Sequence, residues 1–178
     1  MRAHKTEGIV LKRKSLAEAD RIITVFSKHY GKISLMAKGV RKITSRRSPH
    51  IELLNYSKFS IYKGKSMFTL SEVETLSNFS ILKKDLKKIG YAYHICELVD
   101  SLCAENQESQ QIFELLKTTL LDIEKGKDPK IVVNHFEISL LKLLGFSSIE
   151  QDLDFNTHRF IESILERKLK AKEVISSF

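Results

Sequence analysis

The hydrophobic repeat of this chain changes once, near residues 77–80. Before that point apolar and polar residues alternate, as at Ile33 and Leu35, which is typical of strands with one buried face. After it, apolar residues recur at steps of three and four, which is typical of amphipathic helices. The change predicts a strand domain over residues 1–78 and a helical domain over residues 79–178, an α+β fold class.

Five short segments of the first half carry the alternating pattern. Residues 28–31 and 63–65 lie between such segments and contain a glycine, which is typical of hairpin turns. Five antiparallel strands bury little as an open sheet, whereas a closed barrel removes exposed edges and fills its interior with side chains. We therefore predict a five-stranded antiparallel barrel. The expected strands are residues 8–13, 21–27, 32–38, 51–62 and 66–76.

The second half is expected to be an all-α bundle. Apolar spacing predicts a long helix over residues 82–103 and a second over residues 109–125. A third helix begins after Pro129 and is apolar on more than one face, which indicates a position at the centre of the bundle. The acidic segment 146–155 is expected to be irregular, and Asn156 can cap a last helix.

Positive charge is concentrated in the first eighty residues. They carry sixteen of the 30 Lys and Arg residues and six of the 22 Asp and Glu residues, so they are net +10 in a chain that is +8 overall. Such an asymmetry usually indicates a polyanionic partner. Residues 38–47 hold five of these cations between two expected strands, and we predict a mobile basic loop that contacts nucleic-acid phosphates. The alternative is a solvated loop without a ligand.

Aromatic residues on the expected strands could serve as platforms for nucleic-acid bases. Phe59 shares the face of Ile61 and is expected inside the barrel. Tyr56 and Tyr62 are better stacking candidates because their hydroxyl groups tolerate water. The alternative is that both tyrosines simply line the rim of the barrel.

Catalysis and metal binding find little support in the sequence. The six histidines are scattered, and only His94 with Glu97 has a spacing that places two metal ligands on one helix face. His135 and Glu137 have the wrong spacing for a second such pair. No nucleotide-binding or nucleophile motif occurs. We therefore predict no catalytic residue, no metal and no cofactor, and thus a protein that is not an enzyme.

The cysteines and the lengths of the apolar runs indicate the expected cellular location. The two cysteines, Cys96 and Cys103, would lie about 10 Å apart on a helix, too far for a disulfide, and are expected to be buried thiols without zinc. No apolar run reaches membrane-spanning length, and the first residues lack the apolar core of a signal peptide. A cytoplasmic, nucleoid-associated protein without membrane contact is expected.

Several sequence blocks resemble one family in order and spacing. Residues 7–11, 18–22, 29–34 and 37–42, which read EGIVL, EADRI, HYGKIS and AKGVRK, resemble the N-terminal domain of RecO, the bacterial recombination mediator. Blocks in the second half also look like its helical portion, and the resemblance covers most of the chain. These later blocks are residues 91–102, 136–146 and 169–172.

The resemblance implies an OB-fold barrel that binds single- and double-stranded DNA, and a helical domain that contacts the acidic, hydrophobic tail of single-stranded DNA-binding protein. It further implies that the chain works with RecR, anneals complementary strands and helps load the RecA recombinase onto coated strands, in DNA repair and homologous recombination by the RecF pathway. Lys84 and Lys88 could supply a cation for the tail, or could be part of a solvated helix face. The expected DNA-binding residues are Lys32, Lys38, Arg41, Lys42, Arg46, Arg47 and Tyr62.

One departure from the family is visible. Many relatives carry a cysteine-rich zinc module after the Leu-Gly-Phe segment, whereas residues 146–156 of this chain contain no cysteine. We therefore expect a shortened form that lacks this module and its zinc.

Two other function classes remain open. A basic OB-fold module that binds structured RNA, with the helices as a docking platform for proteins, fits the same charge distribution. A metal-dependent nuclease is a weaker alternative, because its imagined ligands lack a supporting spacing. Those residues are Glu7, Glu18, Asp20 and Glu52.

Overall fold

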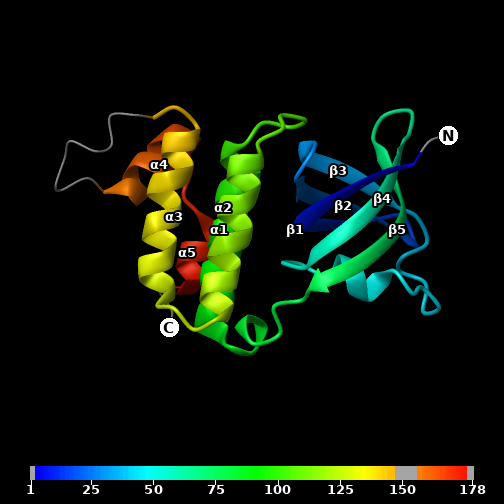
Figure 1. The fold of residues 1–178 in the computed structure, drawn as a ribbon, viewed down its shortest axis with the longest axis horizontal. Helices are drawn as coiled ribbons and strands as arrows, with labels where there is room; N and C mark the ends of the chain where they lie inside the picture. Colours follow the sequence, from blue (N-terminus) through cyan, green and yellow to red (C-terminus); the bar gives the residue numbers. More distant parts are fainter. Residues whose placement is uncertain (1–2, 147–155, 176–178) are drawn as a thin grey trace. The chain divides into compact units, whose positions relative to one another are not determined.

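A closed barrel of five strands forms the first half of the chain (Figure 1). The computed structural model describes residues 3–146 and 156–175. The strands follow one another around the barrel in the order β1-β2-β3-β5-β4, so the prediction of a five-stranded barrel is confirmed. Their bounds are β1 (His4–Leu16), β2 (Asp20–Ser27), β3 (Gly31–Ala37), β4 (Tyr56–Lys63) and β5 (Phe68–Ser77).

The sheet is mixed rather than purely antiparallel. Four strand pairs are antiparallel, but β3 and β5 pair in parallel through Leu35 with Phe68 and Met36 with Thr69. The expectation of a fully antiparallel barrel was wrong at this one junction. The reason is that β4 pairs with β1, which leaves β5 to close the barrel against β3, and a strand's hydrophobic period does not specify the direction of its neighbour.

Alternate strand residues fill the barrel with apolar side chains. Ile23, Leu35, Phe59 and Ile61 are among the fully buried members of this core. The connection between β3 and β4 contributes Val40 and Ile51 to the same core. Ile51 belongs to the short helix η1 (Ser48–Ile51), which begins with Pro49 near its first position, so the strand expected from residue 51 begins only at Tyr56.

A segment from the second half of the chain returns to the barrel. The chain divides into one unit made of Met1–Asn78 with Ala104–Phe113, and a second made of Phe79–Cys103 with Glu114–Phe178. In the first unit the backbone N–H of Asn106 donates to the carbonyl of Lys32 at 2.8 Å. Gly31, at a φ of +64°, has no room for a side chain, because a Cβ would lie 1.9 Å from the carbonyl oxygen of Gln107.

The second unit is built mainly from helices. α1 packs against α3 and α5, and α3 packs against α4. Polar side chains cap three of the helices: Asp85 caps α1, Asp128 caps α3, and Asn156 caps α4 as expected from the sequence. The bounds are η2 (Leu82–Lys84), α1 (Leu86–Leu102), α2 (Gln110–Glu124), α3 (Pro129–Leu143), α4 (Thr157–Leu165) and α5 (Lys170–Ile175), of which α2 begins in the first unit.

The first long helix differs from its expected form. The Asp85 carboxylate accepts hydrogen bonds from the N–H groups of Lys87 and Lys88, which separates α1 from the short helix η2. Leu86 stands in the first turn after this cap and is 68% exposed, so it does not belong to the buried stripe that the spacing suggested. A helix cap overrides the apolar period at this point.

The third helix is only partly enclosed. Phe136, Leu140 and Leu141 are fully buried, but Ile131 is 69% exposed near the start of the helix. The expectation of a wholly central helix was therefore wrong for this end. The irregular segment expected over residues 146–155 lies, beyond Phe146, outside the described residues. No helix within residues 3–146 and 156–175 has the length and apolar character needed to span a bilayer.

Candidate nucleic-acid interface

The basic loop after β3 is folded into hydrogen-bonded turns. The N–H of Gly39 donates to the Asp20 carboxylate at 2.7 Å, and the N–H of Arg41 donates to the carbonyl of Ala19 at 2.9 Å. Val40, between these residues, is fully buried in the barrel core. The start of the loop is therefore tied to the β1–β2 turn, and no sequence pattern indicated these anchors.

The side chains of two expected DNA-binding arginines donate hydrogen bonds to backbone carbonyl groups. Arg47 donates from Nη1 to the carbonyl of Leu70 at 3.0 Å and from Nη2 to the carbonyl of Lys38 at 2.6 Å. Arg41 donates from Nη1 to the carbonyl of Ala17 at 2.9 Å. Arg47 thus fastens the far end of the loop to β5, whereas Arg41 fastens its start to the β1–β2 turn.

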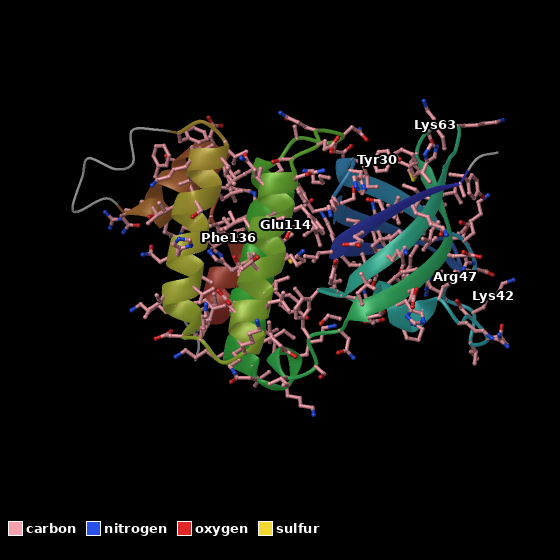
Figure 2. The ribbon with its side chains drawn as sticks, in the orientation of Figure 1. Tyr30, Lys42, Arg47, Lys63, Glu114 and Phe136 are labelled. Carbon is pink, nitrogen blue, oxygen red and sulfur yellow. The ribbon has the colours of Figure 1, made fainter. Side chains whose placement is uncertain are left out.

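Three other cations of the loop face solvent. Lys38, Lys42 and Arg46 are exposed, and within residues 3–146 and 156–175 their side chains have no hydrogen-bond or ion-pair partner. Figure 2 shows Lys42 pointing away from the barrel, beyond Arg47. We call these three residues the loop cations. They are available to meet an anionic ligand without breaking an existing contact.

The strand register places a row of side chains beside these cations. Directly paired residues on neighbouring strands point to the same face of a sheet. Because Ile23, Leu35, Leu70 and Ile61 point into the core, their neighbours point outward. This outer row crosses all five strands, and its members are Lys14, Ile22, Met36, Thr69 and Tyr62.

The two stacking candidates have different environments. Tyr56 donates a short hydrogen bond to the Glu7 carboxylate, and its ring lies 6.2 Å from that of Phe113. Tyr62 is half-buried at the end of the outer row. The structure therefore leaves Tyr62 as the better platform for a base.

Lys32 is separated from the other expected residues. It is only 9% exposed, and its backbone pairs with the returning segment at Glu105 and Asn106. Lys32 and Lys38 stand at opposite ends of β3. Arg47 holds the basic loop against Leu70, which follows Thr69 of the outer row, whereas Lys32 lies at the far end of β3 from the loop.

Sequence reasoning did not single out two cations near the outer row. Lys12 and Lys14 are exposed on the outward face of β1, opposite Thr24 and Ile22 of β2. A bulge between Val10 and Lys12 changes the register of β1, so only the structure places these lysines beside β2. Lys63 lies elsewhere, at the hairpin between β4 and β5, where it lines a cavity with Asn106 of the returning segment (Figure 2).

Another part of the barrel surface has mixed charge. Lys58 of β4 pairs in register with Glu74 of β5, and Ser60 pairs with Glu72. Lys5, Lys58, Glu72 and Glu74 line one shallow cavity of about 260 Å³. Cations here have carboxylates beside them, so this surface attracts a polyanion less strongly than the surface around the loop cations.

The helical residues expected to bind a partner do not share one helix. Lys84 ends η2, and Lys88 lies in the first turn of α1, beyond the Asp85 cap. The two lysines therefore do not form the continuous polar stripe that a single helix would give.

The metal pair considered from spacing is also not formed. The Glu97 carboxylate accepts from Arg167 Nη1 at 2.9 Å and from the N–H groups of Lys170 and Ala171. Burial opposes its ionisation, but these hydrogen bonds and the Arg167 charge outweigh burial and hold the pKa of Glu97 below its ordinary value. His94 instead meets Glu137, with 2.6 Å between Nε2 and Oε1.

Comparison with known proteins places both halves of the chain in one family. Residues 1–79 match the family model described as recombination protein O N terminal, and residues 83–152 match the model described as recombination protein O C terminal. These matches begin and end close to the change of period in the sequence.

Curated relatives agree with the family models. A DNA repair protein RecO from Acetivibrio thermocellus is 39% identical over 144 residues, which is 80% of this chain and 57% of that protein. Proteins of the same name from Listeria welshimeri and Pelotomaculum thermopropionicum are 34% and 33% identical, over 79% and 84% of this chain and 55% and 58% of those proteins. The chain spans little more than half the length of these relatives. With a closed five-stranded barrel, a helical second half and matches to both family models, the chain belongs to the RecO family.

Proposed function

We propose that the barrel binds single- and double-stranded DNA through the loop cations and the outer row, and that the protein acts as a mediator in DNA repair and homologous recombination. The observation that carries this proposal is the set of three exposed, unpartnered cations, Lys38, Lys42 and Arg46, beside an outward row that ends in Tyr62. OB-fold barrels bind oligonucleotides on the face of their second and third strands. Ile22 and Met36 of the outer row lie on those strands.

Phosphate contacts supply the affinity in this proposal. Lysine and arginine side chains that neutralise phosphates release condensed counterions, which gives binding without base specificity. Tyr62 adds one stacking surface for an unpaired base. A surface that screens two strands at once also lowers their mutual repulsion, which favours annealing. No catalytic group is required for any of these steps.

The finer assignments follow from family membership. We propose that residues 1–78 serve as the DNA-binding domain and that residues 79–178 serve to meet proteins. In this proposal the helical part meets the acidic, hydrophobic tail of single-stranded DNA-binding protein, and the chain works with RecR to help load RecA in the cytoplasm, at the nucleoid. Lys84 and Lys88 are two separate candidate contacts for the acidic tail, because the Asp85 cap lies between them.

A salt titration tests the DNA-binding surface. The triple variant Lys38→Ala/Lys42→Ala/Arg46→Ala should bind single- and double-stranded DNA more weakly, and the slope of log K against log salt should flatten by about 2 for single strands, at roughly 0.7 per lost phosphate contact. Fluorescence anisotropy with labelled oligonucleotides measures both quantities.

The matched control removes cations from the mixed-charge surface. Lys5→Ala/Lys58→Ala should change the slope less, because both lysines line a cavity together with Glu72 and Glu74. Equal affinity and slope for the triple variant and the unmodified chain would refute the loop assignment. Competition between DNA and a structured RNA in the same titration tests the RNA-binding alternative, which would be favoured if the RNA displaced DNA at equal concentration.

A peptide titration tests the proposed partner of the helical part. A labelled peptide with an acidic, hydrophobic end should bind the full chain, and Lys84→Glu or Lys88→Glu should weaken binding through charge repulsion. Lys117→Glu, on α2, is a control of equal charge change. If all three variants bind as the unmodified chain does, neither lysine contacts the tail.

A further inference from the structure

Three helices of the second unit bring metal-binding side chains together. His94 lies on α1, Glu137 on α3 and His158 on α4, and one ligand atom from each lies within 4.8 Å of the other two. His94 is 3% exposed and Glu137 is 7% exposed, whereas His158 is half-buried. Two imidazoles and a carboxylate form the donor set of many three-ligand zinc and iron sites.

The buried polar atoms of this cluster are incompletely satisfied. His94 Nε2 lies 2.6 Å from Glu137 Oε1, but His94 Nδ1 is buried and has no hydrogen-bond partner among the described residues. Most buried polar groups are paired, because an unpaired one loses its hydration without compensation. A histidine that served only to bridge two helices would normally have both ring nitrogens satisfied.

The surroundings leave room for an ion and a further ligand. A cavity of about 590 Å³ is lined by all three residues of the cluster, together with Tyr91, Asn134 and Lys130. Three protein ligands and an open fourth position are typical of exchangeable transition-metal sites. Lys130 adds a positive charge to the lining of this cavity. That charge favours an anion or a water molecule, rather than a second cation, at the fourth ligand position.

A carboxylate is also placed to orient one of the histidines. Glu162 Oε1 lies 3.3 Å from His158 Nε2, one helical turn farther along α4. The same carboxylate oxygen accepts a hydrogen bond from the N–H of Leu169 at 3.1 Å. Metal-binding histidines commonly have a second ring nitrogen held by such a group, which fixes the orientation of the ring.

We propose that His94, Glu137 and His158 bind one divalent transition-metal ion, with Zn²⁺ as the best match to the donor set. The ion joins α1, α3 and α4, because each helix contributes one ligand. The site contains no cysteine and is therefore chemically different from the cysteine-rich zinc module of other family members. The proposal does not depend on DNA binding by the barrel.

Zinc binding to the untagged chain tests the proposal. After removal of metal with a chelator, isothermal titration with Zn²⁺ should give one saturable site per chain, and the melting temperature should rise with bound metal. His158→Gln should bind at least about 100-fold more weakly, since loss of a supporting group alone typically costs 10–100-fold. His135→Gln, which removes an exposed histidine from α3, is the matched control and should bind as the unmodified chain does.

A second measurement does not depend on any variant. Nuclear magnetic resonance of the histidine ring nitrogens should show His94 and His158 shifting on addition of Zn²⁺ while His135 stays unchanged. Absence of saturable binding by the folded chain, equal binding by His158→Gln, or shifts confined to exposed histidines would each overturn the assignment.

Discussion

The charged side chains of the barrel and those of the helical unit are arranged in opposite ways. Lys38, Lys42 and Arg46 of the barrel face solvent without a partner in the described part of the chain. In the helical unit His94 is buried against Glu137, and Glu97 accepts three hydrogen bonds. These three barrel cations are therefore open to an external anion, whereas these charged groups of the helical unit join its own helices.

This difference predicts which substitutions change attraction to a polyanion and which change the free energy of unfolding. Removing an exposed charge changes long-range attraction to a polyanion and leaves the fold nearly unchanged. Removing one member of a buried pair leaves its partner without compensation and lowers the free energy of unfolding. Four measurements test this distinction.

The largest effect on stability is expected at the buried pair. In metal-free protein, Glu137→Leu should lower the free energy of unfolding by about 3 kcal/mol, because the buried His94 ring loses the carboxylate that its Nε2 meets. Lys42→Ala is the outward-facing comparison and should change stability by no more than about 0.5 kcal/mol. Urea unfolding measures both, and equal losses would contradict the distinction.

A smaller effect separates two neighbouring arginines of the loop. Arg47→Ala should lower stability by about 1–2 kcal/mol, because its guanidinium joins Lys38 to Leu70 through backbone carbonyls. Arg46→Ala should instead leave unfolding unchanged and weaken DNA binding. Equal destabilisation by Arg46→Ala and Arg47→Ala would show that the hydrogen bonds of Arg47 are not what anchors the loop.

A pH-dependent effect is expected at Glu97. Its pKa in the folded chain lies below the ordinary value of 4.5, so its contribution to stability is present above that pH and is lost as the pH falls through the folded-state pKa. Glu97→Gln should therefore have a lower free energy of unfolding than the unmodified chain near pH 7. The gap should narrow on acidification, as measured by the midpoints of urea unfolding. Glu114→Gln, which removes the exposed member of an ion pair with Lys117, is the control and should lower stability less at pH 7.

The smallest change is expected at the cysteines. Burial, with a further contribution from the nearby Asp100, raises the pKa of Cys96 to about 12, so its thiol stays protonated at neutral pH. A thiol reagent should leave Cys96 unmodified in the native chain and modify it after unfolding in guanidinium chloride. Rapid labelling of Cys96 in the native state would show that this part of α1 opens readily.

Local patterns predicted much of the fold because each depends on neighbouring residues. The period of two located all five barrel strands, and Asn156 was recognised as the cap of α4. The same reasoning extended the first helix across Asp85, where a cap interrupts the apolar period. It also started a strand at residue 51, where Pro49 favours a short helix.

The candidate sites were predicted less completely. The loop cations lie within one short segment, residues 38–47, and were recognised by their charge, but the anchoring roles of Arg41 and Arg47 depend on carbonyl groups from other strands and turns. The cluster of His94, Glu137 and His158 was not predicted at all, because its members come from three helices with no shared spacing.

The barrel and the location of the excess positive charge could be predicted from the sequence alone, because periodicity and charge are properties of the residues and their order. The tertiary structure was needed to show which loop cations are hydrogen-bonded, which outward side chains lie in the row of Tyr62, and that His94 meets Glu137 rather than Glu97. Those outcomes depend on strand register and on helix packing, and both bring together residues that are distant along the chain.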